Sequence, residues 1–437
     1  AWTPIGNQSK QFAGTFDGQG FTVSGLYISV SGAVYNQGLF GYIGAGGTVK
    51  NTGVAASYIK GPAYVGGIAG CNAGRIENCR NGAYVEASQI VGGIAGEAAG
   101  GSVIEKSGNT GEIRAASQKS GGIVGYGAGT VGNCFNAGAV SAGVNQTGGV
   151  VGFNRSGGLI ENSYNTGTVS GALSGGMAGS NNGGSTIRNC YSTGTVSGDL
   201  SGGVAGINSD STIADCYYLT GSALRDIGGT PGNTAGRSEA AFIGGEAAWL
   251  LQGSGSTLVW GHTALNGTQA PLLAAFVPEA VRVVRVRFWG DGEEETPLAS
   301  AYALTGGTVS FPTPSSESHH LTGWRDGGEN PYTESSAFSA DTDLYAQWQI
   351  NTYTVTLPAG AGFTAAAESG SASPVAHGGS YSFKIALDAA HSQSAITVRA
   401  NGSALTPANG VYTITGIAQD QTVTVEGVTV NTYAVTL

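Results

Sequence analysis

The chain has 437 residues, of which 77 are glycine, and only 11% of its residues are charged. Glycine at more than twice its usual frequency excludes a mainly helical protein, because each glycine inside a helix costs about 1 kcal/mol relative to alanine. A formal net charge of −10 argues against nucleic acid and anionic membranes as partners, since both require clustered lysine and arginine. The composition therefore predicts an all-β chain with many tight turns.

The first half of the chain carries an internal repeat of about 27 residues. The repeat is marked by a Gly-Gly-x-x-Gly segment, and the first glycines of its doublets are Gly66, Gly92, Gly121, Gly148, Gly175 and Gly202. Each copy holds short β-prone runs broken by glycine and asparagine turns. A single copy cannot bury its apolar face, so copies are expected to stack. We therefore expect residues 1–228 to form a right-handed parallel β-helix, or solenoid, with an N-terminal cap.

Stacking turns each repeat position into a column of residues. A second motif, as in Arg75–Cys79, follows each glycine segment and predicts an interior apolar column, an Asn column and a Cys/Ser column. The apolar column is Ile76, Ile104, Val131, Ile160, Ile187 and Ile213. The Asn column is Asn78, Asn133, Asn162 and Asn189, interrupted by Lys106 and ending at Asp215. The Cys/Ser column is Cys79, Ser107, Cys134, Ser163, Cys190 and Cys216.

Each column has an expected physical role. Stacked Asn amides hydrogen-bond from coil to coil and satisfy turn backbone. The alternation of Cys with Ser indicates a slot for a small side chain. Cys190 and Cys216 should be neighbours, and the sequence leaves open whether they are bonded.

The candidate ligand-binding residues directly follow the Cys/Ser column. Four of these residues are aromatic: Phe135, Tyr164, Tyr191 and Tyr217. Stacked rings could form a platform for sugar rings or a patch for a protein partner. The simpler interpretation, a ladder that only stabilises the stack, stays open beside it.

The doublet glycines are expected to permit corners with positive φ and a close approach between coils. On this interpretation, Gly148→Val should destabilise the solenoid far more than Gly143→Val, because Gly143 lies in a variable turn.

These motifs resemble the GLUG repeat of bacterial surface proteins over roughly residues 38–220. The preceding stretch Phe12–Gly20 is similar to the lead-in that often comes before such repeats. Residues 229–278 look like a familiar ending, with an Ala-rich helix around Glu239–Leu251, and are expected to cap the solenoid.

Two further modules are expected after residue 278. Residues 279–349 resemble a Listeria–Bacteroides repeat, the internalin B-type repeat with a β-grasp-like fold, most specifically through Leu344–Trp348. Residues 350–428 hold β-prone runs separated by turns, which predict a small β-sandwich. The segment Asn351–Leu357 (NTYTVTL) returns as Asn431–Leu437 (NTYAVTL). We therefore expect residues 429–437 to begin a truncated further module of a longer modular protein.

The sequence predicts no catalytic residues, no cofactor and no metal site. All five histidines lie outside the predicted coils, which removes the usual base for a nucleophilic site on the solenoid. A column containing Glu77, Glu105 and Glu161 also contains Lys50 and Arg188, and it is more simply a solvated stripe than a catalytic one.

The resemblance implies a non-enzymatic adhesin or stalk on the bacterial cell surface, and therefore an extracellular location. Its partner would be a host or cell-surface protein or glycan, without nucleic acid and without membrane insertion. Two alternatives stay open. The chain could be a glycan-binding or glycan-processing β-helix, which would cluster Asp, Arg or Lys on neighbouring coils, or an accessory region of a larger surface peptidase.

Overall fold

A computed structural model describes all residues except 1, 228–233, 266, 291–293 and 435–437. The chain divides into two compact units. The first contains Ala1–Arg285, Tyr302–Gly307 and Ala337–Ala340, and the second contains Val286–Ala301, Thr308–Ser336 and Asp341–Leu437. The predicted end of the solenoid at residue 228 and the last three residues of the repeated C-terminal segment lie outside the described residues.

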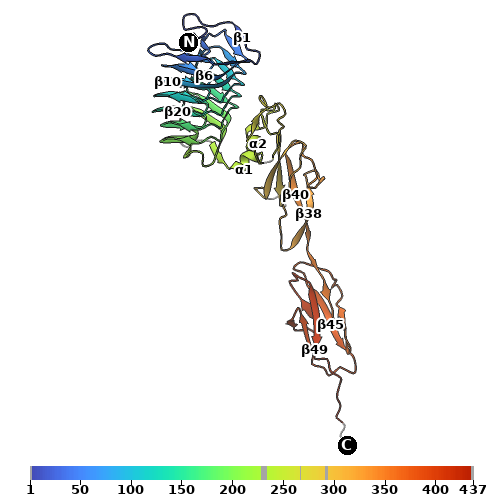
Figure 1. Ribbon diagram of the computed structural model, residues 1–437. Coiled ribbons are helices and arrows are strands. Elements are labelled where there is room, and N and C mark those ends of the chain that lie inside the picture. Colours follow the sequence, from blue (N-terminus) through green and yellow to red (C-terminus); the bar gives the residue numbers. More distant parts are fainter. Residues whose placement is uncertain (1, 228–233, 266, 291–293, 435–437) are drawn as a thin grey trace. The chain divides into compact units, whose positions relative to one another are not determined.

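The first unit contains the predicted parallel β-solenoid, with about eight coils (Figure 1). Complete coils contribute strands to five stacked columns, and neighbouring coils pair in parallel. Among the described residues, three columns make up a 20-stranded sheet and two make up a 13-stranded sheet.

The 20-stranded sheet has three columns. The first consists of β1 (Thr15–Asp17), β5 (Thr48–Lys50), β9 (Arg75–Glu77), β13 (Val103–Glu105), β18 (Thr130–Gly132), β23 (Leu159–Glu161) and the first parts of β28 (Thr186–Ser192) and β31 (Thr212–Leu219). The second consists of β2 (Thr22–Ser24), the first parts of β6 (Gly53–Gly61) and β10 (Arg80–Ala87), β14 (Gly108–Asn109), β19 (Phe135–Asn136), β24 (Tyr164–Asn165), the ends of β28 and β31, and β33 (Thr234–Arg237). The third consists of β3 (Tyr27–Ser29), the ends of β6 and β10, β15 (Ile113–Ala115), β20 (Val140–Ala142), β25 (Val169–Ser170) and β29 (Val196–Ser197).

The 13-stranded sheet has two columns and carries the Gly-Gly-x-x-Gly segments. One consists of β7 (Val65–Gly66), β11 (Ile90–Gly92), β16 (Lys119–Gly121), β21 (Gln146–Gly148), β26 (Leu173–Gly175), the first part of β30 (Leu200–Ser209) and β32 (Arg225–Ile227). The other consists of β4 (Phe40–Ile43), β8 (Ala69–Asn72), β12 (Ala95–Ala98), β17 (Val124–Gly127), β22 (Val151–Asn154), β27 (Ala178–Asn182) and the end of β30.

The register between coils confirms the predicted apolar column. Ile104 pairs with Ile76 in one neighbouring coil and with Val131 in the other. Every member of the column is buried, and Ile213 in the last coil is the most exposed at 7%. The solenoid interior is therefore one continuous hydrophobic cluster built from equivalent positions.

The predicted Asn column is confirmed, and it has a backbone reason that the sequence analysis did not give. Its members have left-handed backbone, with φ between 46° at Asn162 and 51° at Asn133. Asparagine tolerates this conformation better than most residues with a side chain. Asn78 also donates its amide to Asn51 Oδ1 over 2.9 Å. Lys106 adopts the same conformation with φ of 49°, although it has no side-chain amide.

A second Asn ladder lies inside the solenoid and was missed by the sequence analysis. Asn109 donates its Nδ2 to Asn136 Oδ1 over 2.7 Å and to the carbonyl oxygen of Gly111 over 2.8 Å. The same pattern recurs in neighbouring coils. The fully buried members of this ladder are Asn81, Asn109, Asn136, Asn165 and, in the next coil, Ser192. The ladder stabilises the stack because each buried amide keeps its hydrogen bonds.

The Cys/Ser column is confirmed as a slot for small side chains that also donate a hydrogen bond. The Cys134 thiol lies 3.2 Å from the carbonyl oxygen of Gly132, and the Ser163 hydroxyl donates to the carbonyl oxygen of Glu161 over 2.8 Å. The five cysteines, all among the described residues, are free and buried, although Cys190 and Cys216 are register partners. Burial raises the pKa of the Cys134 thiol to about 12, which makes it a poor nucleophile at neutral pH.

The doublet glycines are explained by close approach alone, so the expectation of positive φ at these positions was wrong. A Cβ atom built on Gly148 would lie 1.9 Å from the carbonyl oxygen of Val151. A Cβ atom on Gly149 would lie 2.1 Å from the carbonyl oxygen of Gly176 in the next coil. No side chain fits at either distance. Positive φ occurs instead at the Asn corners.

The Ala-rich segment forms two short helices rather than one. Helix α1 (Glu239–Ile243) begins after Ser238, whose hydroxyl accepts a hydrogen bond from the amide of Ala241. Helix α2 (Glu246–Gln252) begins after Gly245, which has a φ of 97°. This left-handed glycine breaks the predicted helix, since a continuous helix requires negative φ at every position. The strands β34 (Trp260–Gly261) and β35 (Leu272–Leu273) follow as an antiparallel pair.

A five-stranded sheet follows in the described part of the chain, in the order β37-β36-β40-β38-β39. Its strands are β36 (Val283–Trp289), β37 (Ala299–Leu304), β38 (His319–Arg325), β39 (Pro331–Tyr332) and β40 (Thr342–Ile350). Strands β36 and β40 pair in parallel, and Arg287 forms a bidentate ion pair with Asp343 between them. We call this sheet the middle module.

The C-terminal module contains two larger sheets that share one hydrophobic cluster. The strands of the module are β41 (Thr352–Tyr353), β42 (Val355–Thr356), β43 (Phe363–Ala367), β44 (Val375–Ala376), β45 (Tyr381–Leu387), β46 (Thr397–Ala400), β47 (Ser403–Leu405), β48 (Tyr412–Ile414) and β49 (Gln421–Glu426). One sheet has the order β42-β49-β46-β47 and the other β43-β45-β48. Phe383, fully buried, lies in the shared cluster.

The glycine contacts predict a large difference between two single substitutions. Gly148→Ala should lower the free energy of unfolding by about 3 kcal/mol or more, because the added methyl group meets a backbone oxygen that cannot move alone. Gly143, the control that the sequence suggested, is unsuitable because its Cβ would lie 2.3 Å from the Ala116 carbonyl oxygen. Gly100 is exposed with nothing within 4 Å, so Gly100→Ala should change stability by less than about 0.5 kcal/mol. Equal denaturant midpoints for the two variants would contradict the role of close approach.

Candidate functional site

The predicted aromatic column forms a stacked ladder on a lateral face of the solenoid. The rings of Phe135 and Tyr164 have centroids 5.5 Å apart and are inclined by 14°. The centroids of the Tyr164 and Tyr191 rings are 5.2 Å apart, and the two ring planes are nearly parallel, inclined by 4°. Tyr217 continues the register below Tyr191. The structure therefore brings all four predicted residues together.

This ladder is covered by residues 239–265 and 267–276, which we call the lateral segment. The indole ring of Trp260 lies 5.3 Å from the ring of Tyr191, and Phe276 lies 5.1 Å from Phe135. The hydroxyl of Tyr191 donates to the carbonyl oxygen of Pro271 over 2.8 Å. Tyr191 and Tyr217 are consequently 1% and 8% exposed. The predicted binding of a ligand to these rings stays untested, and it would require the lateral segment to leave them.

The lateral segment was expected to cover the open edge of the last coil. In the structure that edge is paired by β32 and β33, which continue the two sheets, and β33 (Thr234–Arg237) lies within residues 229–278, the range expected to form the cap. The lateral segment packs on the side of the stack and reaches back to Arg80, whose guanidinium lies 4.6 Å from the Phe276 ring centroid. The aromatic signal in the sequence was therefore a signal for an intramolecular docking surface.

Buried polar groups in the lateral segment fit this structural role. His262 is fully buried, and burial lowers its pKa to about 4, so the ring is uncharged near neutral pH. Gln252 accepts hydrogen bonds from the amides of Val259 and Trp260 and thereby fixes the loop that follows α2. These contacts hold Trp260 against the ladder.

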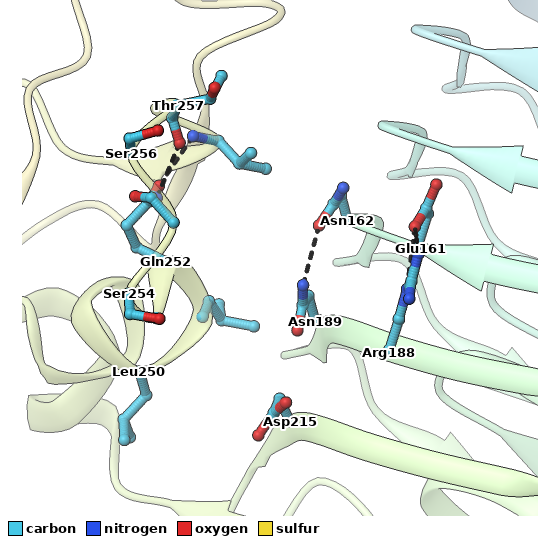
Figure 2. Close-up of a pocket in the computed structure, with 14 residues that line it drawn as sticks. Glu161, Asn162, Arg188, Asn189, Asp215, Leu250, Gln252, Ser254, Ser256 and Thr257 are labelled. Atoms are coloured by element: carbon cyan, nitrogen blue, oxygen red, sulfur yellow. Dashed lines mark hydrogen bonds and ion pairs between the residues drawn. The ribbon is translucent and has the colours of Figure 1, made fainter.

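A cleft of about 700 Å³ lies between the Asn column and the loop after α2. Figure 2 shows Asn162, Asn189 and Asp215 on the solenoid side, facing the loop that carries Ser254 and Ser256. Aliphatic side chains of Leu250, Leu251 and Val259 also line it. Clefts of this size with a few polar groups are typical small-molecule sites.

Several polar groups of the cleft are already paired with one another. The Arg188 guanidinium donates to Glu161 Oε2 over 2.6 and 3.0 Å, and Asn189 donates to Asn162 Oδ1 over 3.4 Å (Figure 2). Asp215 is exposed and has no ion-pair partner among the described residues. The cleft can therefore offer one free carboxylate and loop hydroxyls beside an aliphatic wall, which is chemistry for binding a polar molecule.

A second aromatic column, exposed at Tyr27 and half-buried at Tyr58 and Tyr84, was missed by the sequence analysis. The rings of Tyr27, Tyr58 and Tyr84 stack with centroid separations of 5.6 Å and are inclined by 22° and 3°. Tyr27 is 58% exposed. An ion pair between Lys60 Nζ and Glu86 Oε1, which are 3.0 Å apart, lies beside the column. The available signal was a Tyr followed by Ile or Val in three early coils, at Tyr27, Tyr58 and Tyr84.

The predicted carboxylate column is an array of ion pairs. Glu77 lies 3.3 Å from Arg75 and 3.6 Å from Lys106, and Arg75 also pairs with Glu105 in the neighbouring coil. Among the described residues, no group of three or more His, Cys, Asp and Glu side chains is arranged to hold a metal ion. The arrangement matches the predicted solvated stripe.

Comparison with known proteins shows that one coil is similar to a described repeat motif. Residues 143–170 match the GLUG motif. The register places the other Gly-Gly-x-x-Gly copies in the same columns as this coil, with Gly121, Gly148 and Gly175 as direct partners. The first half of the chain is therefore a solenoid of GLUG-like repeats. No solved structure gives a significant match to the chain.

Two curated proteins are similar to parts of the chain. A putative Gly-rich membrane protein of Evansella cellulosilytica is 39% identical over 80 residues, which cover 18% of this chain and 9% of that protein. Halomucin of Haloquadratum walsbyi is 35% identical over 95 residues, which cover 22% of this chain and 1% of that protein. The chain thus spans less than a tenth of either relative. Within the described residues, no helix has the length and hydropathy needed to cross a membrane.

The buried ladder predicts a pH-dependent contribution of Tyr191 to stability. Burial raises the pKa of Tyr191 well above its ordinary value of 10.0, so the folded state keeps the proton that the unfolded state loses above pH 10. Stability from this residue is fully present below pH 10 and falls by about 1.4 kcal/mol per pH unit above it. Tyr191→Phe, which removes the hydrogen bond to Pro271, should be about 1 kcal/mol less stable than wild type at pH 8.

The two free energies of unfolding should cross within about one pH unit above pH 10, because phenylalanine does not ionise. Denaturant unfolding between pH 8 and pH 11.5 measures this crossing. Tyr433→Phe is the matched control, since Tyr433 is 75% exposed. A constant difference between wild type and Tyr191→Phe across this range would contradict the burial of the ladder.

Proposed function

We propose that this chain is part of a non-enzymatic bacterial cell-surface adhesin or stalk that acts outside the cell. The observation that carries the proposal is the tyrosine column on the outside of the solenoid, in which Tyr27 is exposed and Tyr58 and Tyr84 are half-buried. Exposed aromatic side chains supply large contact area at low entropic cost, which is why they are enriched at binding surfaces. The proposed partner is a host or cell-surface protein or glycan.

The internal pairing of the other polar columns supports a non-enzymatic role. The Glu column is bound by Arg75, Lys106 and Arg188, and the buried Asn ladder is saturated by its own hydrogen bonds. A catalytic acid or base needs a free group held in a desolvated cleft. Asp215, in the cleft beside the loop after α2, is exposed instead.

The modular organisation and the comparisons also support a surface role. A solenoid followed along the chain by small β modules is the kind of organisation expected of a modular surface protein. The middle module, which resembles a Listeria–Bacteroides repeat, and the sandwich-like C-terminal module would act as spacers. One similar protein is named as a putative membrane protein and the other as a halomucin.

An adhesion assay tests the proposal. Beads coated with the full chain are passed over surfaces carrying mucin, collagen or bacterial cell-wall polysaccharide, and the retained fraction is counted under flow. We expect retention on at least one surface, and a loss of tenfold or more for Tyr58→Ser combined with Tyr84→Ser. The matched control is Tyr433→Ser, which removes an exposed tyrosine from the C-terminal end.

Two outcomes would contradict the proposal. Retention no higher than that of uncoated beads on every surface would remove the adhesive role. Release of reducing sugar from the polysaccharide by the purified chain would favour the glycan-processing alternative, and Asp215→Asn would then identify whether the cleft carries that activity.

A further inference from the structure

The repeated Asn-Thr-Tyr segment occupies two equivalent places in the second unit. One copy begins the C-terminal module at Asn351, directly after β40, and the other copy begins at Asn431, after β49. Each copy follows the last strand of a module and contacts a loop of that same module. The two copies contact different residues, so their hydrogen bonds can be compared.

Asn351 clamps the loop that precedes β38 in the middle module. Its backbone amide donates to the carbonyl oxygen of Ser318 over 2.8 Å, and its Nδ2 donates to that of Glu317 over 3.1 Å. Its Oδ1 lies 3.0 Å from Nδ1 of His320. One asparagine therefore uses its backbone amide and both ends of its side-chain amide on residues 317–320, a segment that runs from this loop into the start of β38.

Asn431 clamps the Asp388–Ser394 loop of the C-terminal module in the same way. Its backbone amide donates to the carbonyl oxygen of Ala390 over 2.8 Å, and its Nδ2 donates to that of Ala389 over 2.8 Å. Its Oδ1 accepts from the backbone amide of Gln393 over 2.9 Å. The partners follow the same order along the chain in both copies. The first carbonyl oxygen accepts from the asparagine side chain, the next accepts from its backbone amide, and a nitrogen further along faces its Oδ1.

The match between the copies does not come from the loop sequences. The first loop reads Glu-Ser-His-His and the second Ala-Ala-His-Ser-Gln. What the two segments share is a pair of adjacent carbonyl oxygens followed by a nitrogen that faces Oδ1, which is the His320 ring nitrogen in one copy and the Gln393 amide in the other. An asparagine side chain can both donate and accept, so it can satisfy such a set. Aspartate could only accept, and serine would be too short to reach both partners.

The two copies differ in the tyrosine that follows. Tyr353 packs against the core of the C-terminal module, and its hydroxyl lies 3.3 Å from Nδ1 of His377. Tyr433 is 75% exposed. The second copy is thus docked by its asparagine, while its tyrosine has no module core to enter among the described residues.

We propose that the Asp388–Ser394 loop is a docking site for the first strand of a module of the same kind, and that this asparagine clamp joins successive modules end to end. The occupant is a second copy of the C-terminal module, because only that module buries the tyrosine that follows the clamp.

The first arm of the test uses the full chain and hydrogen exchange. Asn431→Ala removes the acceptor for the Gln393 amide, which should then exchange about fivefold faster, as expected for the loss of one net hydrogen bond. Thr432→Ala is the matched control and should leave the Gln393 amide unchanged. Equal exchange of the Gln393 amide in the wild type and Asn431→Ala would overturn the clamp.

The second arm tests the occupant. Residues 358–430 are appended after Leu437, so that residues 431–437 become the first strand of a complete module. Hydroxyl-radical footprinting should then show at least fivefold lower modification of Tyr433, together with slower exchange of the Gln393 amide. A folded appended module, shown by protection of its copy of Phe383, with Tyr433 and Gln393 unchanged would overturn the docking proposal.

Discussion

Backbone carbonyl oxygens lie so close to the doublet glycines that a single methyl group would not fit between them. At Gly148 and Gly149 the missing Cβ atoms would lie about 2 Å from carbonyl oxygens of the same coil and of the next coil. This close approach sets the register of neighbouring coils, because shifting a coil by one residue would place a side chain where only hydrogen fits. The column structure of the whole solenoid follows from that register.

The polar ladders depend on the same register. Asn109 can donate to Asn136 because their strands align residue by residue. The side chain of Asn136 in turn packs so close to Gly122 that a Cβ atom there would lie 2.3 Å from its Cγ. The buried ladder therefore both requires and reinforces the glycine contacts. The corner column adds a backbone constraint, since its residues must adopt positive φ where the chain turns.

The sequence was sufficient to predict the repeated positions but not the function of every column. Spacing alone located Ile104 in the interior and Cys190 beside Cys216, because periodicity translates directly into stacking. It could not show that Tyr191 is covered, since that depends on Trp260, which lies about 70 residues later in no repeated pattern. It also could not show that Gly245 breaks the Ala-rich helix, because a glycine inside a helical pattern is tolerated in many proteins.

The two aromatic columns show why exposure, rather than residue type, decides a candidate site. Both are stacks of rings with similar separations, but one is the docking surface for the lateral segment and the other faces outward beside an ion pair. The proposed adhesive role follows the outward column. The repeated asparagine clamp is a second case in which contacts, rather than residue type, identify a candidate site. The short Asn-Thr-Tyr motif became informative because both of its copies make the same set of hydrogen bonds.

Cross-linking of register partners tests the stacking of the coils most directly. Glu161 is paired with Arg188 in the next coil, and Arg188 is paired with Ala214 in the coil after that. Paired strands lie about 4.8 Å apart, within the Cα separation that a disulfide can bridge, whereas two coils span nearly twice that distance. Oxidation of Glu161→Cys combined with Arg188→Cys should give an intramolecular disulfide in nearly all molecules, and Glu161→Cys combined with Ala214→Cys should give almost none. Equal yields, or a higher yield for the second pair, would contradict the registered solenoid.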